Sequence, residues 1–289
     1  MEDLQVNEAQ LLDQYSLEIT VKDVPALEAA KSNIPAGSAI SVTYLHHENA
    51  DSRVAAAVAA RRLRFNPVPH IAARRLRSAD ELLGTLARFT AEASVDRVFV
   101  IAGDIDKVDG PYADSLAVIR SGLLETSGIR AVGISGYPEG HPKISREALW
   151  ESLRGKTLAL QERGLDCEIV TQFGFDPDAV IEWLARLRQE GITAPVRIGL
   201  PGPANIPTLL RFAAFCGVAT SAKVLTKYGL SVSRLVGSAG PDRFVNSLLE
   251  RLSPALHGEV RVHLYPFGGL ARAADWARTY GGAAQRKCS

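Results

Sequence analysis

The chain has 289 residues, of which 46% are hydrophobic, and a formal net charge of +1. This near-neutral balance gives no electrostatic reason to expect nucleic acid as a partner. No apolar run approaches the roughly 20 residues that span a bilayer, and the polar start MEDLQVNEAQ is unlike a signal peptide. Three widely spaced cysteines without a CxxC pair indicate reduced thiols. We therefore expect a cytoplasmic protein.

Eight short apolar runs, rich in β-branched residues, predict strands along the chain. They cover residues 15–21, 39–44, 68–72, 98–102, 131–135, 168–171, 196–200 and 260–264. Helical stretches lie between them. The helix signals are Ser78 and Glu81 as a capping box, Ser145, Asp176-Pro177 and Pro241 as further starts, and Gly164 as an end.

Strand and helix alternate eight times, which is typical of a (β/α)8 barrel. A doubly wound open sheet is the competing arrangement, but regular units without linker composition favour closure. We predict an α/β fold in which residues 1–289 form a single (β/α)8 TIM-barrel catalytic domain with a short polar N-terminal extension. A helical segment at residues 219–230 is predicted as an insertion at the ligand face or rim.

Several motif-like strings do not meet the requirements of the sites they suggest. Gly155-Lys156-Thr157 lies within a helical stretch and lacks the upstream glycine of a phosphate-binding loop. His46 and His47 are adjacent on a strand end and point opposite ways, so we predict no metal site. No GxSxG elbow is present. The basic clusters at 61–64 and 74–77 are interpreted as solvated faces, with contact to an anionic cofactor as the alternative.

Polar and aromatic residues follow the apolar strands where a buried strand has no structural need for them. They are Glu18, Thr43, Tyr44, His70, Gly103, Asp104, Ser135, Tyr137, His141 and Gln172. In parallel α/β folds, ligands bind at the carboxyl ends of the strands. This ring of strand-end residues indicates an enzyme.

Glu18 is the strongest single candidate, because strand alternation places it on one face with Ser16 and Thr20, toward the barrel interior. A buried carboxylate without a partner is costly and tends to hold its proton. The alternative is an ion pair with an interior lysine or arginine, which no strand plainly supplies. For Asp104 the alternative is a turn cap, and His70 taken alone is more typical of a satisfied core histidine.

These residues together resemble the methylenetetrahydrofolate reductase family, in which a flavin binds at the mouth of a (β/α)8 barrel. The resemblance runs from about Tyr15 to Ala277. It is carried by the strings Tyr137-Pro-Glu-Gly-His141-Pro, Val170-Thr-Gln172-Phe-Gly-Phe-Asp176, Ser41-Val-Thr43-Tyr44, Pro69-His70, Gly103-Asp104 and His263-Leu-Tyr265. Each string alone is weak, but six in the right order are specific.

The resemblance implies a role for each matching position. Glu18 matches the general acid that helps open the methylene bridge to an iminium, and Asp104 matches the aspartate close to flavin and folate. Gln172 matches the glutamine that hydrogen-bonds the pterin and nicotinamide. The positions implied to contact FAD are Thr43, His70, Gly103, Asp104, Tyr112, Ala113, Ser135, Tyr137, His141 and, across an alignment gap, Lys156.

The chain also departs from the family pattern. Ala102 replaces an arginine, and Arg74 or Lys107 is expected to compensate for the missing cofactor contact. Ile206 replaces an aromatic residue that stacks on substrate, and Gly174 interrupts a Phe-rich run. These changes bear on nicotinamide binding more than on folate chemistry. No C-terminal regulatory domain is expected.

The resulting hypothesis is FAD-dependent interconversion of 5,10-methylenetetrahydrofolate and 5-methyltetrahydrofolate, with NADH or NADPH as electron donor. The physiological direction stays open. We expect a homo-oligomer in one-carbon metabolism and methionine biosynthesis. Two alternatives remain, namely a barrel flavoprotein with a different electron donor or acceptor, and a non-catalytic partner subunit.

Overall fold

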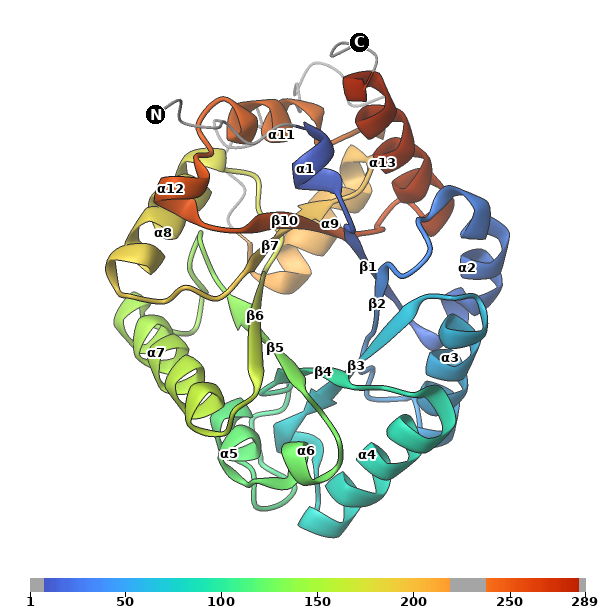
Figure 1. Cartoon of the computed structure of the whole chain (residues 1–289), viewed down its shortest axis with the longest axis vertical. Coiled ribbons are helices and arrows are strands. Elements are labelled where there is room, and N and C mark those ends of the chain that lie inside the picture. The colour runs from blue at the N-terminus through green and yellow to red at the C-terminus, as the bar shows by residue number, and fades with distance from the viewer. Residues whose placement is uncertain (1–7, 219–237, 286–289) are drawn as a thin grey trace.

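The computed structural model describes residues 8–218 and 238–285, and parallel strands within them close into a barrel (Figure 1). The barrel strands are β1 (Ser16–Ile19), β2 (Ala39–Val42), β3 (Asn66–Ala72), β4 (Arg97–Ile101), β5 (Ala131–Gly136), β6 (Asp166–Thr171), β7 (Val196–Pro201) and β10 (Val260–Tyr265). Their order around the barrel is β1-β10-β7-β6-β5-β4-β3-β2. The predicted fold class is confirmed.

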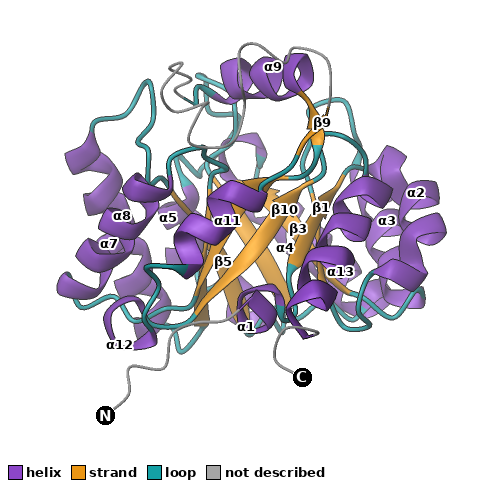
Figure 2. Ribbon diagram, turned by 90° about the horizontal axis from the view of Figure 1, so that it is seen from above, coloured by secondary structure: helices purple, strands orange, loops and turns teal. Residues whose placement is uncertain are grey.

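Helices surround the barrel (Figure 1). They are α1 (Glu8–Leu12), α2 (Val24–Ala30), α3 (Ala50–Arg62), α4 (Ala79–Ala93), α5 (Ser115–Arg120), α6 (Leu123–Thr126), α7 (Arg146–Glu162), α8 (Pro177–Gln189), α9 (Ile206–Cys216), α11 (Asp242–Leu249), α12 (Pro254–His257) and α13 (Leu270–Gln285). Short 3-10 turns are η1 (Val21–Asp23), η2 (Lys31–Asn33) and η3 (Ala73–Arg75). The strands β8 (Ala204–Asn205) and β9 (Ser238–Ala239) pair into a two-stranded antiparallel sheet, which lies with α9 over one end of the barrel (Figure 2).

The helices begin at the polar residues that predicted them. Ser145 accepts a bond from the Ala148 N–H at the start of α7, and Asp176 caps α8. At α4 the Ser78 hydroxyl accepts from the Glu81 N–H, as in a capping box. The Glu81 carboxylate, however, accepts from the Arg77 N–H rather than from Ser78.

The element boundaries shift by a few residues from those predicted. The first strand ends at Ile19 because the Asp23 carboxylate binds the N–H and hydroxyl of Thr20 and starts η1. Strands β3 and β6 begin two residues earlier than predicted, at Asn66 and Asp166. The predicted helical segment at 219–230 lies outside the described residues.

A charged cluster fills the end of the barrel where the strands begin. The Glu168 carboxylate accepts from Arg197 at 2.8 Å and lies 3.3 Å from Arg97. Arg197 also donates to the Gln14 carbonyl at 2.7 Å, which ties the segment before β1 to the barrel floor. These charged side chains lie at the opposite end of the barrel from the polar residues that follow the strands.

Candidate active site at the barrel mouth

Glu18 lies at the mouth beside a histidine from the last strand. Parallel pairing of β1 with β10 places Ser16 opposite His263. The Ser16 hydroxyl is 2.7 Å from His263 Nδ1, and His263 Nε2 is 3.6 Å from the Glu18 carboxylate. His263 is 2% exposed, whereas the Glu18 side chain is 25% exposed and faces the mouth. The partner is therefore a histidine, and not the interior lysine or arginine considered from sequence.

His70 completes the polar floor of the mouth as a buried, neutral imidazole. Burial lowers its pKa to about 4, with His263 and Arg53 lowering it further and Glu18 opposing them. Its ring packs against Phe99, with centroids 4.8 Å apart. An uncharged His70 can donate or accept one hydrogen bond at each ring nitrogen.

Arg53 is a supporting residue that the sequence did not single out. It lies within α3, is 4% exposed, and donates to the His70 carbonyl. Its guanidinium lies 4.5 Å from the centroid of the Tyr44 ring, so it holds two strand-end residues together. Burial lowers its pKa to about 10, which leaves it charged at neutral pH. The one available signal was an arginine in an otherwise Ala-rich helical stretch.

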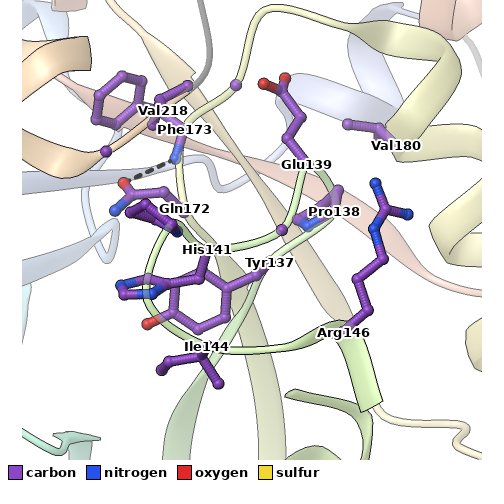
Figure 3. A pocket seen from close by; sticks show the side chains of 14 residues that line it. Tyr137, Pro138, Glu139, His141, Ile144, Arg146, Gln172, Phe173, Val180 and Val218 are labelled. Atoms are coloured by element: carbon purple, nitrogen blue, oxygen red, sulfur yellow. Dashed lines mark hydrogen bonds between the residues drawn. The ribbon is translucent and has the colours of Figure 1, made fainter. Parts of the chain in front are cut away.

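The loop after β5 forms an aromatic wall of the mouth. The rings of Tyr137 and His141 meet edge to face with centroids 5.5 Å apart (Figure 3). Burial raises the pKa of Tyr137, opposed by a hydrogen bond with Ser135. A cavity of about 270 Å³ lies between this loop, the loop after β6 and residues 217–218.

Gln172 follows β6 and faces the same cavity (Figure 3). Its side-chain oxygen accepts from the Phe173 N–H at 3.1 Å. The amide NH2 group is therefore turned away from that backbone and is available as a donor. The hydroxyl of the half-buried Tyr265 donates to the Thr171 carbonyl, which fixes the end of β6.

Asp104 lies on the rim rather than inside the mouth. Its side chain is 71% exposed and pairs with Arg75 at 2.8 Å, and the hydrogen bond from Arg75 lowers its pKa. Gly103 beside it adopts a left-handed φ of +99°, which turns the chain out of β4. Arg75 thus supplies a cation near the position where Ala102 replaces the family arginine.

Of the two residues expected to compensate for Ala102, Arg74 lies beside it, because its N–H donates to the Ala102 carbonyl at 2.9 Å. Its guanidinium, however, donates to the carbonyls of Ala113 at 2.8 Å and Ile105 at 3.2 Å, so it braces the loop after β4. Lys107 is exposed on that loop. Tyr112, in the same loop, is 6% exposed, and burial raises the pKa of its hydroxyl.

Three other predicted contact residues are buried. Lys156 is 6% exposed within α7, where burial lowers its pKa and the charge of Asp114 opposes that shift. Ile206 begins α9, is 7% exposed and belongs to the hydrophobic core. Thr43 donates its hydroxyl to the Ile19 carbonyl. The structure therefore does not bring Lys156 and Ile206 into the open cavity beside Tyr137.

Cys216, at the end of α9, lies within electrostatic reach of Glu18. Burial raises the pKa of its thiol to about 11, and the Glu18 carboxylate acts in the same direction. Among residues 8–218 and 238–285, no three His, Cys, Asp or Glu side chains are placed to hold a metal ion. No helix in that part of the chain is long and apolar enough to cross a membrane.

The protein is a (β/α)8 barrel, since its parallel strands close on themselves. Charged side chains lie where the strands begin, and the polar residues at the carboxyl ends form a candidate ligand site at the mouth. Residues 25–251 match the sequence model of the methylenetetrahydrofolate reductase family, and the chain belongs to that family.

Individual relatives are distant. The chain is 29% identical over 116 residues to methylenetetrahydrofolate reductase (NADH) 1 of Arabidopsis thaliana, covering 38% of this chain and 19% of the relative. It is 27% identical over 123 residues to a protein of rice (Oryza sativa subsp. japonica) described as a probable methylenetetrahydrofolate reductase (NADH), covering 41% of this chain and 21% of the relative. The aligned segment thus spans about a fifth of these curated relatives.

A solved structure shares the fold. It is an uncharacterized protein from Clostridium thermocellum that binds two copies of 5-methyl-5,6,7,8-tetrahydrofolic acid. The TM-score is 0.55 at 10% identity, and the match covers 98% of this chain and 99% of that one. At this identity the likeness shows the barrel fold alone.

Proposed function

We propose that the protein interconverts 5,10-methylenetetrahydrofolate and 5-methyltetrahydrofolate, using FAD and NADH or NADPH. The observation that carries the proposal is the Ser16–His263–Glu18 arrangement at the mouth, in a chain of this family. The folate bound by the similar solved barrel supports a folate substrate. The amide of Gln172 lies on the same mouth as a donor for a planar heterocycle.

The residues present fit the ring end of FAD. Tyr137 and His141 offer an aromatic wall beside a cavity, and His70 offers a neutral imidazole. The diphosphate has fewer partners, because Lys156 is buried and Arg74 is bound to two carbonyls. We infer that Tyr137, His141 and His70 hold the ring.

FAD, when bound, supplies a carrier that takes a hydride from the pyridine nucleotide and passes it to the folate one-carbon unit. Glu18 donates a proton to the folate amine, which opens the methylene bridge to a reducible iminium. His263 orients that carboxyl, since its Nδ1 is held by Ser16 and its Nε2 faces Glu18. The 3.6 Å separation exceeds a hydrogen bond, and catalytic contacts often tighten only when substrate is bound.

Asp104 would stabilise the positive iminium by its negative charge. In the structure Arg75 neutralises that charge on the rim. We infer that Asp104 acts on the substrate only when the Arg75 contact loosens. Gln172 would orient the pterin through its free NH2 group.

The test is an anaerobic titration of the purified protein. We expect visible flavin absorption, its loss on adding NADH or NADPH, and its return on adding methylenetetrahydrofolate. A protein that cannot be reconstituted with FAD would overturn the proposal. Flavin that is reduced but not reoxidised by folate would favour a barrel flavoprotein with another acceptor. Neither flavin nor folate binding would favour a non-catalytic partner subunit.

A further inference from the structure

We propose that Glu139 is a positioning residue that locks the loop after β5 to the loop after β6. The lock would set the distance between the wall formed by Tyr137 and His141 and the amide of Gln172. Its catalytic consequence rests on the proposed function, whereas the lock itself is a property of the chain.

The Glu139 side chain joins the loop after β5 to the loop after β6. Glu139 Oε1 accepts from the Phe175 N–H at 2.6 Å and from the Asp176 N–H at 2.8 Å. Asp176 is the N-cap of α8 and Phe175 precedes it, so the Glu139 carboxylate lies at the positive end of the helix dipole, which favours a negative charge. Figure 3 shows the Glu139 side chain extending away from the Tyr137 ring toward that segment.

Gly174 is shaped to the same contact. A β-carbon at Gly174 would overlap with Glu139 Oε1, the end of a flexible side chain. An added methyl group would therefore push the carboxylate aside at little cost to the barrel. The contact with Glu139 accounts for a residue without a side chain at position 174, where this chain departs from the Phe-rich run of the family.

The Glu139 contact fixes the end of the segment 172–176 that precedes α8, while a backbone bond fixes the end that follows β6. The Gln172 N–H donates to the Gly136 carbonyl at 2.8 Å, which extends the pairing of β5 with β6. The Gln172 side chain then binds the Phe173 N–H. In Glu139→Ala, the segment 172–176 would lose the bonds to Phe175 and Asp176 and keep the backbone bond of Gln172 to Gly136. The cavity between the two loops would lose its fixed width.

Three variants test the lock. Glu139→Ala removes the acceptor, Gly174→Ala displaces it, and Glu139→Gln keeps a neutral acceptor oxygen. We expect amide hydrogen exchange at Phe175 and Asp176 to quicken at least about tenfold in the first two variants and less in the third, because charged acceptors bind more strongly. This measurement needs neither cofactor nor activity.

Activity then tests positioning. We expect kcat/KM for the folate to fall about 10- to 100-fold in Glu139→Ala and Gly174→Ala, since small misplacements of reacting groups have effects of that size. Glu139→Gln should retain most of the wild-type kcat/KM. The affinity for FAD should change little in all three variants. The double variant Glu139→Ala/Gly174→Ala should be no slower than Glu139→Ala, because both changes remove one contact.

The matched controls are Gly84→Ala, where no atom lies within 4 Å of the added carbon, and the exposed Glu147→Gln. Both should leave exchange and kcat/KM unchanged. Unchanged exchange at Phe175 and Asp176 overturns the lock, and faster exchange with unchanged kcat/KM overturns positioning. A wild-type protein without folate-linked flavin turnover overturns the proposed function and the positioning role, while exchange still decides the lock.

Discussion

The Ser16 hydroxyl lies 2.7 Å from Nδ1 of His263, a residue 247 positions away in the chain. The contact forms at the seam where β1 pairs with β10, so closure of the barrel creates it. With Nδ1 engaged and the ring 2% exposed, the imidazole has one orientation, in which Nε2 faces Glu18. The buried Ser16 and His263 thus place an imidazole nitrogen 3.6 Å from the carboxylate at the mouth.

Glu18→Gln should separate acid catalysis from cofactor binding. The amide keeps the shape and removes the acid, so FAD binding and flavin reduction by NADH should survive. Oxidation of the reduced protein by methylenetetrahydrofolate should slow by about 100- to 10,000-fold, the usual contribution of a general acid. Stopped-flow measurement of each half-reaction checks this. Equal loss in both half-reactions, or loss of flavin, would show that Glu18 is structural.

His263→Gln should slow the folate half-reaction, because glutamine lacks the ring that Ser16 holds in place beside Glu18. Ser16→Ala should have a smaller effect in the same direction, since the imidazole remains but loses its anchor. The rate of the folate half-reaction in both variants is the measurement, with flavin reduction by NADH as the control. A folate half-reaction as fast in His263→Gln as in the wild type would show that His263 does not orient Glu18.

His70 should make the protein less stable in mild acid. Its pKa is lowered to about 4 in the folded state, against an ordinary value of 6.5. Between those values the unfolded chain binds a proton that the folded chain does not, so stability falls as pH drops from about 6.5 to about 4. The full effect is of the order of 3 kcal/mol. Urea unfolding of the wild type and of His70→Asn, repeated across this pH range, measures the effect. If the free energy of unfolding depends on pH equally in both proteins, His70 does not have the lowered pKa.

Ile206→Phe tests whether an aromatic ring at this position reaches the ligand. Since Ile206 is 7% exposed in the core, we expect overpacking to lower the free energy of unfolding by about 1–3 kcal/mol. The KM for NADH should stay unchanged. A lower KM for NADH in the variant would instead place residue 206 against the nicotinamide, as the family resemblance implied.

Much of the fold was predictable because its signals are local. Apolar strands at 98–102 and 196–200, and caps such as Ser145, depend on a few neighbouring residues. Alternation along β1 also placed Ser16 and Glu18 on one face. The regular alternation of eight strands with helices then favoured closure into a barrel.

The contacts of the site were decided by tertiary structure. Polar residues at the strand ends indicate a ligand site at the mouth of the barrel. Closure of the barrel brings His263 to Glu18, and packing of the loops brings Glu139 to the segment before α8. In the same way, packing pairs Asp104 with Arg75 and buries Lys156 within the helix layer. The sequence by itself determined which polar residues lie on and directly after the strands, since strand periodicity is a property of adjacent residues. Which of them meet was determined by the register of strands and loops far apart in the chain, because hydrogen bonds and ion pairs depend on distances that only the folded barrel sets.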